Sequence, residues 1–262
     1  MKLSCRSFPG VFLLSFLLLV AGCASKRQVS VPQEKEAKPA ELGSEAYHHY
    51  TNAVIMEQEG LAAEAIREYE KALSYEPLSY DVRMALGQLC FRLKRPQDAI
   101  NMILPIPDKN TDTYLLIGDC YQQLGRYRQA QGAYEQALAA EPDNVAASYQ
   151  LGRLALQQEN LEEAAGYYKA AAFHSRNPDL YEQAAKIYAR LGISDSTIAC
   201  FEMALKAGGS NPALYSSLAY YYSIADEIEK AKQTLRKGID IYPFNARLQS
   251  YLIDIYDHED NV

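Results

Sequence analysis

The chain of 262 residues contains 33 Asp and Glu against 26 Lys and Arg, so its formal net charge is −7. This acidic balance argues against nucleic acid as a partner, because the phosphates would repel the protein. Tyrosine is abundant, with 21 residues, and tryptophan is absent, so tyrosine is expected to fill most of the large aromatic packing positions.

Residues 1–22 are predicted to be a secretory signal. Two basic residues give it a positively charged start, and the apolar run at 11–20 is too short for a typical membrane span. The segment Val20–Cys23 resembles a bacterial lipobox. This resemblance implies that the signal is cut before Cys23 and that acyl chains are attached to that cysteine. The alternatives are an ordinary cleaved signal with a chance cysteine and an uncleaved signal anchor.

Acyl chains would hold the protein on a bilayer durably, since each buried methylene contributes about 0.8 kcal/mol. Removal of the signal takes away two positive charges and leaves −9, which argues against an additional polybasic grip on anionic lipid. If the cell has two membranes, Ala24 after the lipid site resembles the outer-membrane sorting pattern. Residues 23–43 combine two prolines and mixed charges without an apolar period, so they are predicted to form a disordered tether.

A repeating pattern begins at Ser44 and is clearest over 111–144. There Gly118 and Ala130 are small residues at the expected crossing of two helices, and a larger side chain would push the backbones apart. The large side chain of Tyr134 is expected to fill the space beside them. Gly125 is placed for a left-handed turn between the helices, and a proline at 142 ends the second helix.

Small residues recur at matching positions along the chain. In the first helix of each expected hairpin the series is Ala53, Gly87, Gly118, Gly152, Ala185, Ala219 and Ile253, and in the second helix it is Ala65, Ala99, Ala130, Ala164, Thr197 and Ala231. The two series share every spacing, including one short step of 31 residues, so each supports the other.

This pattern resembles the tetratricopeptide repeat of about 34 residues. The resemblance implies an all-α fold, a right-handed superhelical solenoid of about six helical hairpins with a C-terminal capping helix. The solenoid is expected to span 44–262, with repeats at about 46–79, 80–110, 111–144, 145–177, 178–211 and 212–245 and the capping helix at 246–258.

Helix ends are also marked in the sequence. Asn177 and Asn211 each precede a proline and are predicted N-caps. In the second repeat, two prolines within 103–107 are predicted to stop the helix about a turn early. A tolerated deletion is favoured here over a bend that opens a groove.

No arrangement of residues predicts catalysis, a metal or a cofactor. The four histidines lack HExxH spacing, and there is no glycine-rich phosphate loop or GxSxG elbow. Beyond the signal and Cys23, the three remaining cysteines are Cys90, Cys120 and Cys200, and buried free thiols are favoured over a disulfide. An enzyme or redox protein using them is the rival from another class. The acidic end at 254–260 is interpreted as a solvated helix terminus.

The resemblance also implies that the concave face, lined by the first helices, binds another protein. The family's inner positions correspond here to Tyr50, Gln88, Asp119, Tyr149, Arg153, Lys186, Arg190 and Tyr220. The last five would form an aromatic and basic stretch suited to a peptide or helix with acidic and apolar groups. A solvated face with scattered polar residues is the alternative. The two-carboxylate clamp of chaperone-binding members is not matched, because Tyr50, Val54 and Gln88 stand at its positions.

With the lipobox, the array resembles envelope lipoproteins that help assemble type IV pili and secretins, and others that recruit murein-processing enzymes. The sequence therefore predicts a lipid-anchored scaffold or adaptor of the bacterial envelope, on the periplasmic face of the outer membrane if there is one. The alternatives are a fixed subunit of an outer-membrane assembly complex, a recruiter of murein-processing enzymes and a self-associating structural protein.

Overall fold

The computed structural model describes residues 42–260, so the predicted signal, Cys23 and the predicted tether up to residue 41 lie outside the described residues. The described part contains thirteen α-helices and no strand. The first six are α1 (Ser44–Gln58), α2 (Ala62–Tyr75), α3 (Tyr80–Arg92), α4 (Pro96–Ile103), α5 (Thr111–Gln123) and α6 (Tyr127–Ala140). The others are α7 (Val145–Gln157), α8 (Leu161–Ser175), α9 (Pro178–Arg190), α10 (Ser194–Lys206), α11 (Pro212–Ile224), α12 (Ile228–Ile241) and α13 (Ala246–Asp260).

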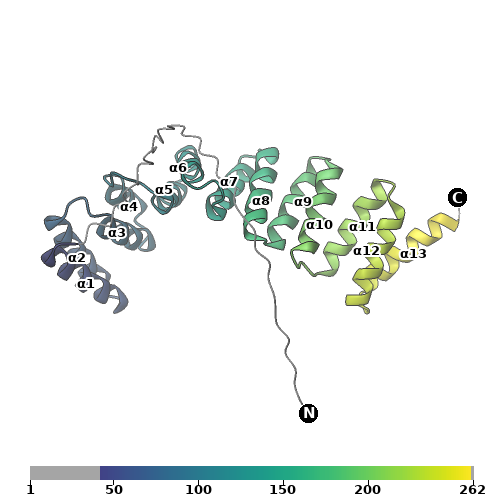
Figure 1. The fold of residues 1–262 in the computed structure, drawn as a ribbon, viewed down its shortest axis with the longest axis horizontal. Helices are drawn as coiled ribbons and strands as arrows, with labels where there is room; N and C mark the ends of the chain where they lie inside the picture. Colours follow the sequence, from purple (N-terminus) through teal and green to yellow (C-terminus); the bar gives the residue numbers. More distant parts are fainter. Residues whose placement is uncertain (1–41, 261–262) are drawn as a thin grey trace, which may run out of the picture. The chain divides into compact units, whose positions relative to one another are not determined.

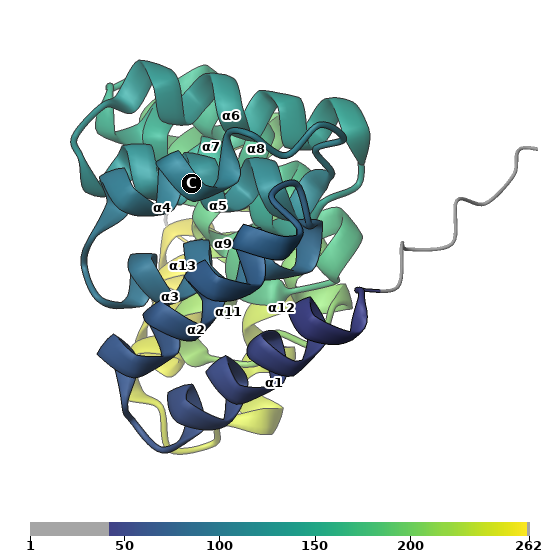
Figure 2. The ribbon, with the colours of Figure 1, turned by 90° about the vertical axis from the view of Figure 1, so that its left-hand side faces the viewer.

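The helices form six consecutive hairpins, α1 with α2 through α11 with α12, and α13 follows without a second helix. Contacts between helices are concentrated between neighbours in the chain, so the hairpins follow one another in sequence order (Figure 1). Viewed towards α1, successive hairpins are turned relative to one another rather than stacked in one plane (Figure 2). The predicted all-α solenoid is therefore confirmed, and each hairpin buries its apolar surface mainly against its neighbours.

Large side chains pack directly against the glycines of the first-helix series. A Cβ atom on Gly118 would stand 2.4 Å from Cε1 of Tyr134, well inside van der Waals contact. A Cβ on Gly87 would meet a side chain of α4 at 2.7 Å, and one on Gly152 would meet the Tyr168 ring at 3.1 Å. The crossings of these hairpins therefore depend on the absence of a side chain, as the sequence pattern predicted.

The last member of the first-helix series differs from the others. Ala53, Ala185 and Ala219 are fully buried, whereas Ile253 is 57% exposed. Among the described residues no second helix pairs with α13, so this position is left uncovered. The requirement for a small residue is thus imposed by the second helix of the same hairpin.

Each turn inside a hairpin places one residue in the left-handed backbone region, with φ between 60° and 79°. In chain order these residues are Gly60, Lys94, Gly125, Glu159, Gly192 and Asp226. The left-handed turn predicted for Gly125 is confirmed. Three of the six positions carry a side chain, so the turn geometry does not require glycine, although glycine adopts it most readily.

Asparagine side chains cap several first helices. Asn177 accepts a hydrogen bond from the Asp179 amide at 2.9 Å, and Asn211 accepts one from the Leu214 amide at 2.8 Å. Both predicted caps are therefore confirmed. Asn144 caps α7 in the same way, which supplies hydrogen-bond acceptors to amides that have no partner within the helix.

The second repeat is shortened as predicted, because α4 has only eight residues. After it, Ile106 turns inwards and is 2% exposed. This isoleucine joins the core formed by the first hairpins, so an apolar side chain occupies space that a longer helix would have filled. This packing supports the interpretation of a tolerated deletion.

Candidate partner-binding site

The three cysteines of the array are free and buried, as predicted. Burial raises the pKa of the Cys90 and Cys200 thiols and raises that of Cys120 to about 12. Because the thiolate is the reactive form, these thiols are poor nucleophiles near neutral pH. Among residues 42–260 there is no cluster of side chains that could hold a metal ion, nor a helix with the length and apolar character needed to cross a membrane.

Three consecutive first helices line a cavity of about 390 Å³, which we call the middle groove. Phe91 of α3, Asp119 of α5 and Arg153 of α7 each contribute to its lining. The complete lining is Phe91, Asp119, Gln122, Gln123, Gln150 and Arg153. All six lining residues therefore belong to first helices.

A chain of hydrogen bonds holds the polar groups of the middle groove in place. The Tyr134 hydroxyl donates to Asp119 Oδ1 at 2.6 Å, and Gln150 Nε2 donates to the same oxygen at 3.1 Å. Burial raises the pKa of the Asp119 carboxyl, and these two hydrogen bonds partly oppose that rise. Arg153 donates to Gln150 Oε1 at 3.0 Å, so the guanidinium and the carboxylate are linked through one amide.

The ring of Tyr149, next to the middle groove, is held by contacts with two neighbouring side chains. The guanidinium carbon of Arg153 lies 5.9 Å from the centre of the Tyr149 ring, within cation–π range. That ring is in edge contact with Tyr168, at a centroid distance of 5.8 Å. Because Tyr168 packs against Gly152, the glycine of the crossing helps to determine where Tyr149 presents its ring.

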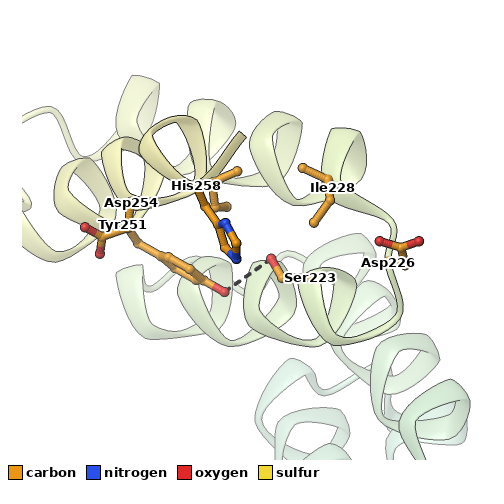
Figure 3. A pocket seen from close by; sticks show the side chains of 7 residues that line it. Ser223, Asp226, Ile228, Tyr251, Asp254 and His258 are labelled. Carbon is orange, nitrogen blue, oxygen red and sulfur yellow. Dashed lines mark hydrogen bonds between the residues drawn. The ribbon is translucent and has the colours of Figure 1, made fainter. Parts of the chain in front are cut away.

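A second groove lies near the C-terminus, between α11 and α13. It comprises a cavity of about 770 Å³ and an adjoining one of about 510 Å³, which share Tyr251 and Asp254. The Tyr251 hydroxyl donates to Ser223 Oγ at 3.4 Å and so links the two helices (Figure 3). We call the two cavities together the α11–α13 groove. Its lining includes Ser216, Ser217, Tyr220, Tyr221, Ser223, Asp226, Ile228, Arg247, Ser250, Tyr251, Asp254, Ile255 and His258.

The eight residues predicted for partner binding are distributed over the array. Asp119 and Arg153 share the middle groove, with Tyr149 beside them, whereas Tyr220 lies in the α11–α13 groove. Lys186 is exposed and pairs with a carboxylate of its own helix at 2.7 Å. The other three are Arg190 and Gln88, which are exposed, and Tyr50, which is half-buried with its ring 5.9 Å from that of Tyr69.

Sequence reasoning missed several of the lining residues. Phe91 and Gln150 lie outside the inner positions that the family pattern specifies, although they are on the expected helices. The α13 residues Arg247, Tyr251 and His258 were missed because this helix was interpreted as a cap. The sequence did contain a signal for them. The first-helix series continues to Ile253 on α13, so this helix extends the surface that the first helices form.

A helical solenoid whose first helices form such grooves belongs to the class of repeat scaffolds for protein–protein interaction. Three tetratricopeptide repeat models match the chain, at residues 57–117, 115–181 and 212–245. The chain therefore belongs to the tetratricopeptide repeat family. No curated protein sequence matches it.

Several solved structures share this fold. The MamA protein is 20% identical, with a TM-score of 0.56 over 63% of this chain and 92% of that chain. The structure of pilF from Pseudomonas aeruginosa is 17% identical, with a TM-score of 0.51 over 80% of this chain and 97% of that one. YrrB, described as a TPR protein with an unusual peptide-binding site, is 19% identical, with a TM-score of 0.51 over 70% and 96%. At these identities the likeness shows the fold alone.

Proposed function

We propose that the protein is a lipid-anchored adaptor of the bacterial cell envelope that holds a segment of another envelope protein against its first helices, without catalysing a reaction. The observation that carries this proposal is the middle groove, where two consecutive hairpins present Asp119, Gln150 and Arg153 already joined by hydrogen bonds. Polar groups held in this way lose little freedom on binding, so more of the contact energy appears as affinity.

The chemistry of the middle groove indicates what the partner segment carries. Asp119 already accepts two hydrogen bonds, whereas Arg153 is exposed and retains donors beyond its bond to Gln150. Phe91 lines the same cavity, and the Tyr149 ring lies within cation–π range of Arg153. An acidic or amide group for Arg153, next to an apolar side chain for the aromatic rings, is the complementary pattern.

The envelope part of the proposal rests on the sequence of residues 1–23 and on the resemblance to lipoproteins that help assemble pili and secretins. The likeness to pilF, which extends over 97% of that chain, is compatible with such a role. The peptide-binding site named for YrrB is compatible with capture of an extended segment. Residence at the periplasmic face of the outer membrane follows if the cell has two membranes.

Replacing Arg153 with glutamate is expected to weaken partner capture by about tenfold, or ~1.4 kcal/mol, because a second carboxylate would then face the segment beside Asp119. Helix content should not change, since Arg153 is exposed. The partner is first identified by photo-cross-linking in cells through a photoreactive residue at position 149. Its affinity for the wild type and each variant is then measured by titration, and the helix content of each protein by circular dichroism. Arg128→Glu, an equal charge reversal at an exposed position of α6, is the matched control. Equal binding by all three proteins would contradict the assignment of the middle groove.

Replacing Cys23 with serine is expected to abolish acylation, because serine offers no thiol for the lipid. The same substitution alters the lipobox at which the signal is cut, so the uncut apolar signal can itself hold the variant in the membrane. Incorporation of fatty acid is therefore the measurement, by metabolic labelling with palmitate of the wild type and the variant. An unlabelled wild-type protein, or a variant labelled as strongly as the wild type, would contradict the proposed anchor.

A further inference from the structure

We propose that the α11–α13 groove binds an extended segment of another protein in which an aliphatic residue is flanked by lysine or arginine. The inference deepens the proposed adaptor function and rests on it, because it names the chemistry of one partner segment. It concerns a different surface from the middle groove. The segment proposed here is basic, whereas the one proposed for the middle groove carries an acidic or amide group.

The larger cavity of this groove has an apolar floor. Ile228 of α12 and Ile255 of α13 contribute aliphatic side chains to its lining, and the ring of Tyr251 lines the same cavity. Figure 3 shows Ile228 and Tyr251 at opposite ends of it. At about 770 Å³ the cavity is large enough to admit several side chains of a bound segment. An aliphatic anchor residue is the occupant that such a floor favours, because burial there removes its apolar surface from water.

Two carboxylates flank this floor. Asp226, at the α11–α12 turn, and Asp254, on α13, lie on opposite sides of the cavity with His258 between them (Figure 3). Neither carboxylate forms a hydrogen bond or an ion pair with another described residue. Among the described residues that line this cavity there is no lysine or arginine, although Arg247 lines the adjoining one. The cavity is therefore complementary to positive charge on both sides of an apolar group.

Charge complementarity favours a basic segment over an acidic one in the α11–α13 groove. A basic residue on each side of the aliphatic anchor can reach Asp226 and Asp254 through its long side chain, whereas an acidic segment would meet two like charges. The net charge of −7 adds a long-range attraction for basic partners. Asp254 belongs to the acidic end at 254–260, for which the sequence predicted only a solvated helix terminus. Here its carboxylate is proposed to contact a basic side chain of the bound segment.

The backbone at Asp226 provides a variant that separates binding from stability. Asp226 and Glu159 occupy the same left-handed turn position of two different hairpins, with φ of 62° and 61°. Replacing either residue with glycine removes one carboxylate and relieves the same backbone conformation. Only Asp226 lines the groove, so the two substitutions differ in the proposed contact and not in charge or turn geometry.

The test uses the full chain in detergent and a fluorescent nine-residue peptide with a central isoleucine, a lysine two residues before and after it, and glycine and serine elsewhere. Fluorescence anisotropy should show saturable binding that Asp226→Gly and Asp254→Asn each weaken by about tenfold and that Glu159→Gly leaves unchanged. Asp226→Gly should melt no lower than the wild type. Peptides with glutamate for both lysines, or serine for the isoleucine, should bind at least tenfold more weakly.

Equal binding of the lysine and glutamate peptides, or an unchanged affinity in Asp226→Gly, would overturn the proposal. A chain that sediments as a dimer without peptide, and as a monomer after Asp226→Gly, would show that a second copy occupies the groove and would equally overturn it. If the lysine peptide fails to bind while position 149 still cross-links to a partner in cells, the adaptor function stands and this inference alone is wrong.

Discussion

Replacing Gly118 with leucine is expected to unfold the middle of the array. Even a single Cβ would stand 2.4 Å from Cε1 of Tyr134, and that ring is fully buried, so it has no free space to enter. Overpacking a core by one or a few methylenes costs about 1–3 kcal/mol. Gly118→Ala is therefore expected to lose about that amount, and leucine more, because its branched end meets the same ring.

The matched control is Gly132→Ala on α6, where a Cβ would meet nothing within 4 Å. There the same substitution should leave stability unchanged or raise it by about 0.5–1 kcal/mol, since alanine is the better helix former. Urea unfolding followed by circular dichroism measures both variants. Equal effects at 118 and 132 would show that the close approach of Tyr134 does not limit residue 118.

Truncating Tyr134 to alanine is expected to cost about 3–5 kcal/mol, as for other buried aromatic side chains. The loss includes the ring that packs on Gly118 and the hydroxyl that donates to Asp119. The same truncation opens space where the Gly118→Ala methyl would go. The double variant should therefore be more stable than the sum of the two single changes predicts, by about 1 kcal/mol or more.

Tyr69 supplies the control for this coupling. It is buried in the first hairpin, far along the chain from Gly118, and Tyr69→Ala should add to Gly118→Ala within about 0.5 kcal/mol. The measurement is a double-mutant cycle from urea unfolding of the four proteins in each series. Additivity in the Tyr134 series would mean that the ring and the glycine do not compete for the same space.

Most of the fold could be predicted from the sequence because the hairpin crossings leave a local signature. A small residue faces a large one at a fixed spacing, as at Gly118 and Tyr134, and each asparagine cap precedes a helix start. The left-handed turns were less visible, because Lys94, Glu159 and Asp226 occupy positions where glycine would have signalled the conformation.

The grooves could be predicted only in part, because they depend on which helices come together. The repeat pattern identified the first helices, and two of the residues that it named, Asp119 and Arg153, line the middle groove. It gave no indication that Gln150 would join them through hydrogen bonds. The α11–α13 groove was not predicted. Tyr251 and Asp254 belong to α13, which follows the six complete repeats and was predicted to be only a capping helix.

Photo-cross-linking in intact cells tests the central claim most directly. A photoreactive phenylalanine analogue replaces Tyr149, which is 38% exposed beside the middle groove, or Phe173, which is 61% exposed on the second helix α8. The account predicts that position 149 yields one discrete adduct with an envelope protein, identified by mass spectrometry, and that the more exposed position 173 does not. The same adducts at both positions, or an adduct at 173 alone, would contradict capture of a partner by the first helices.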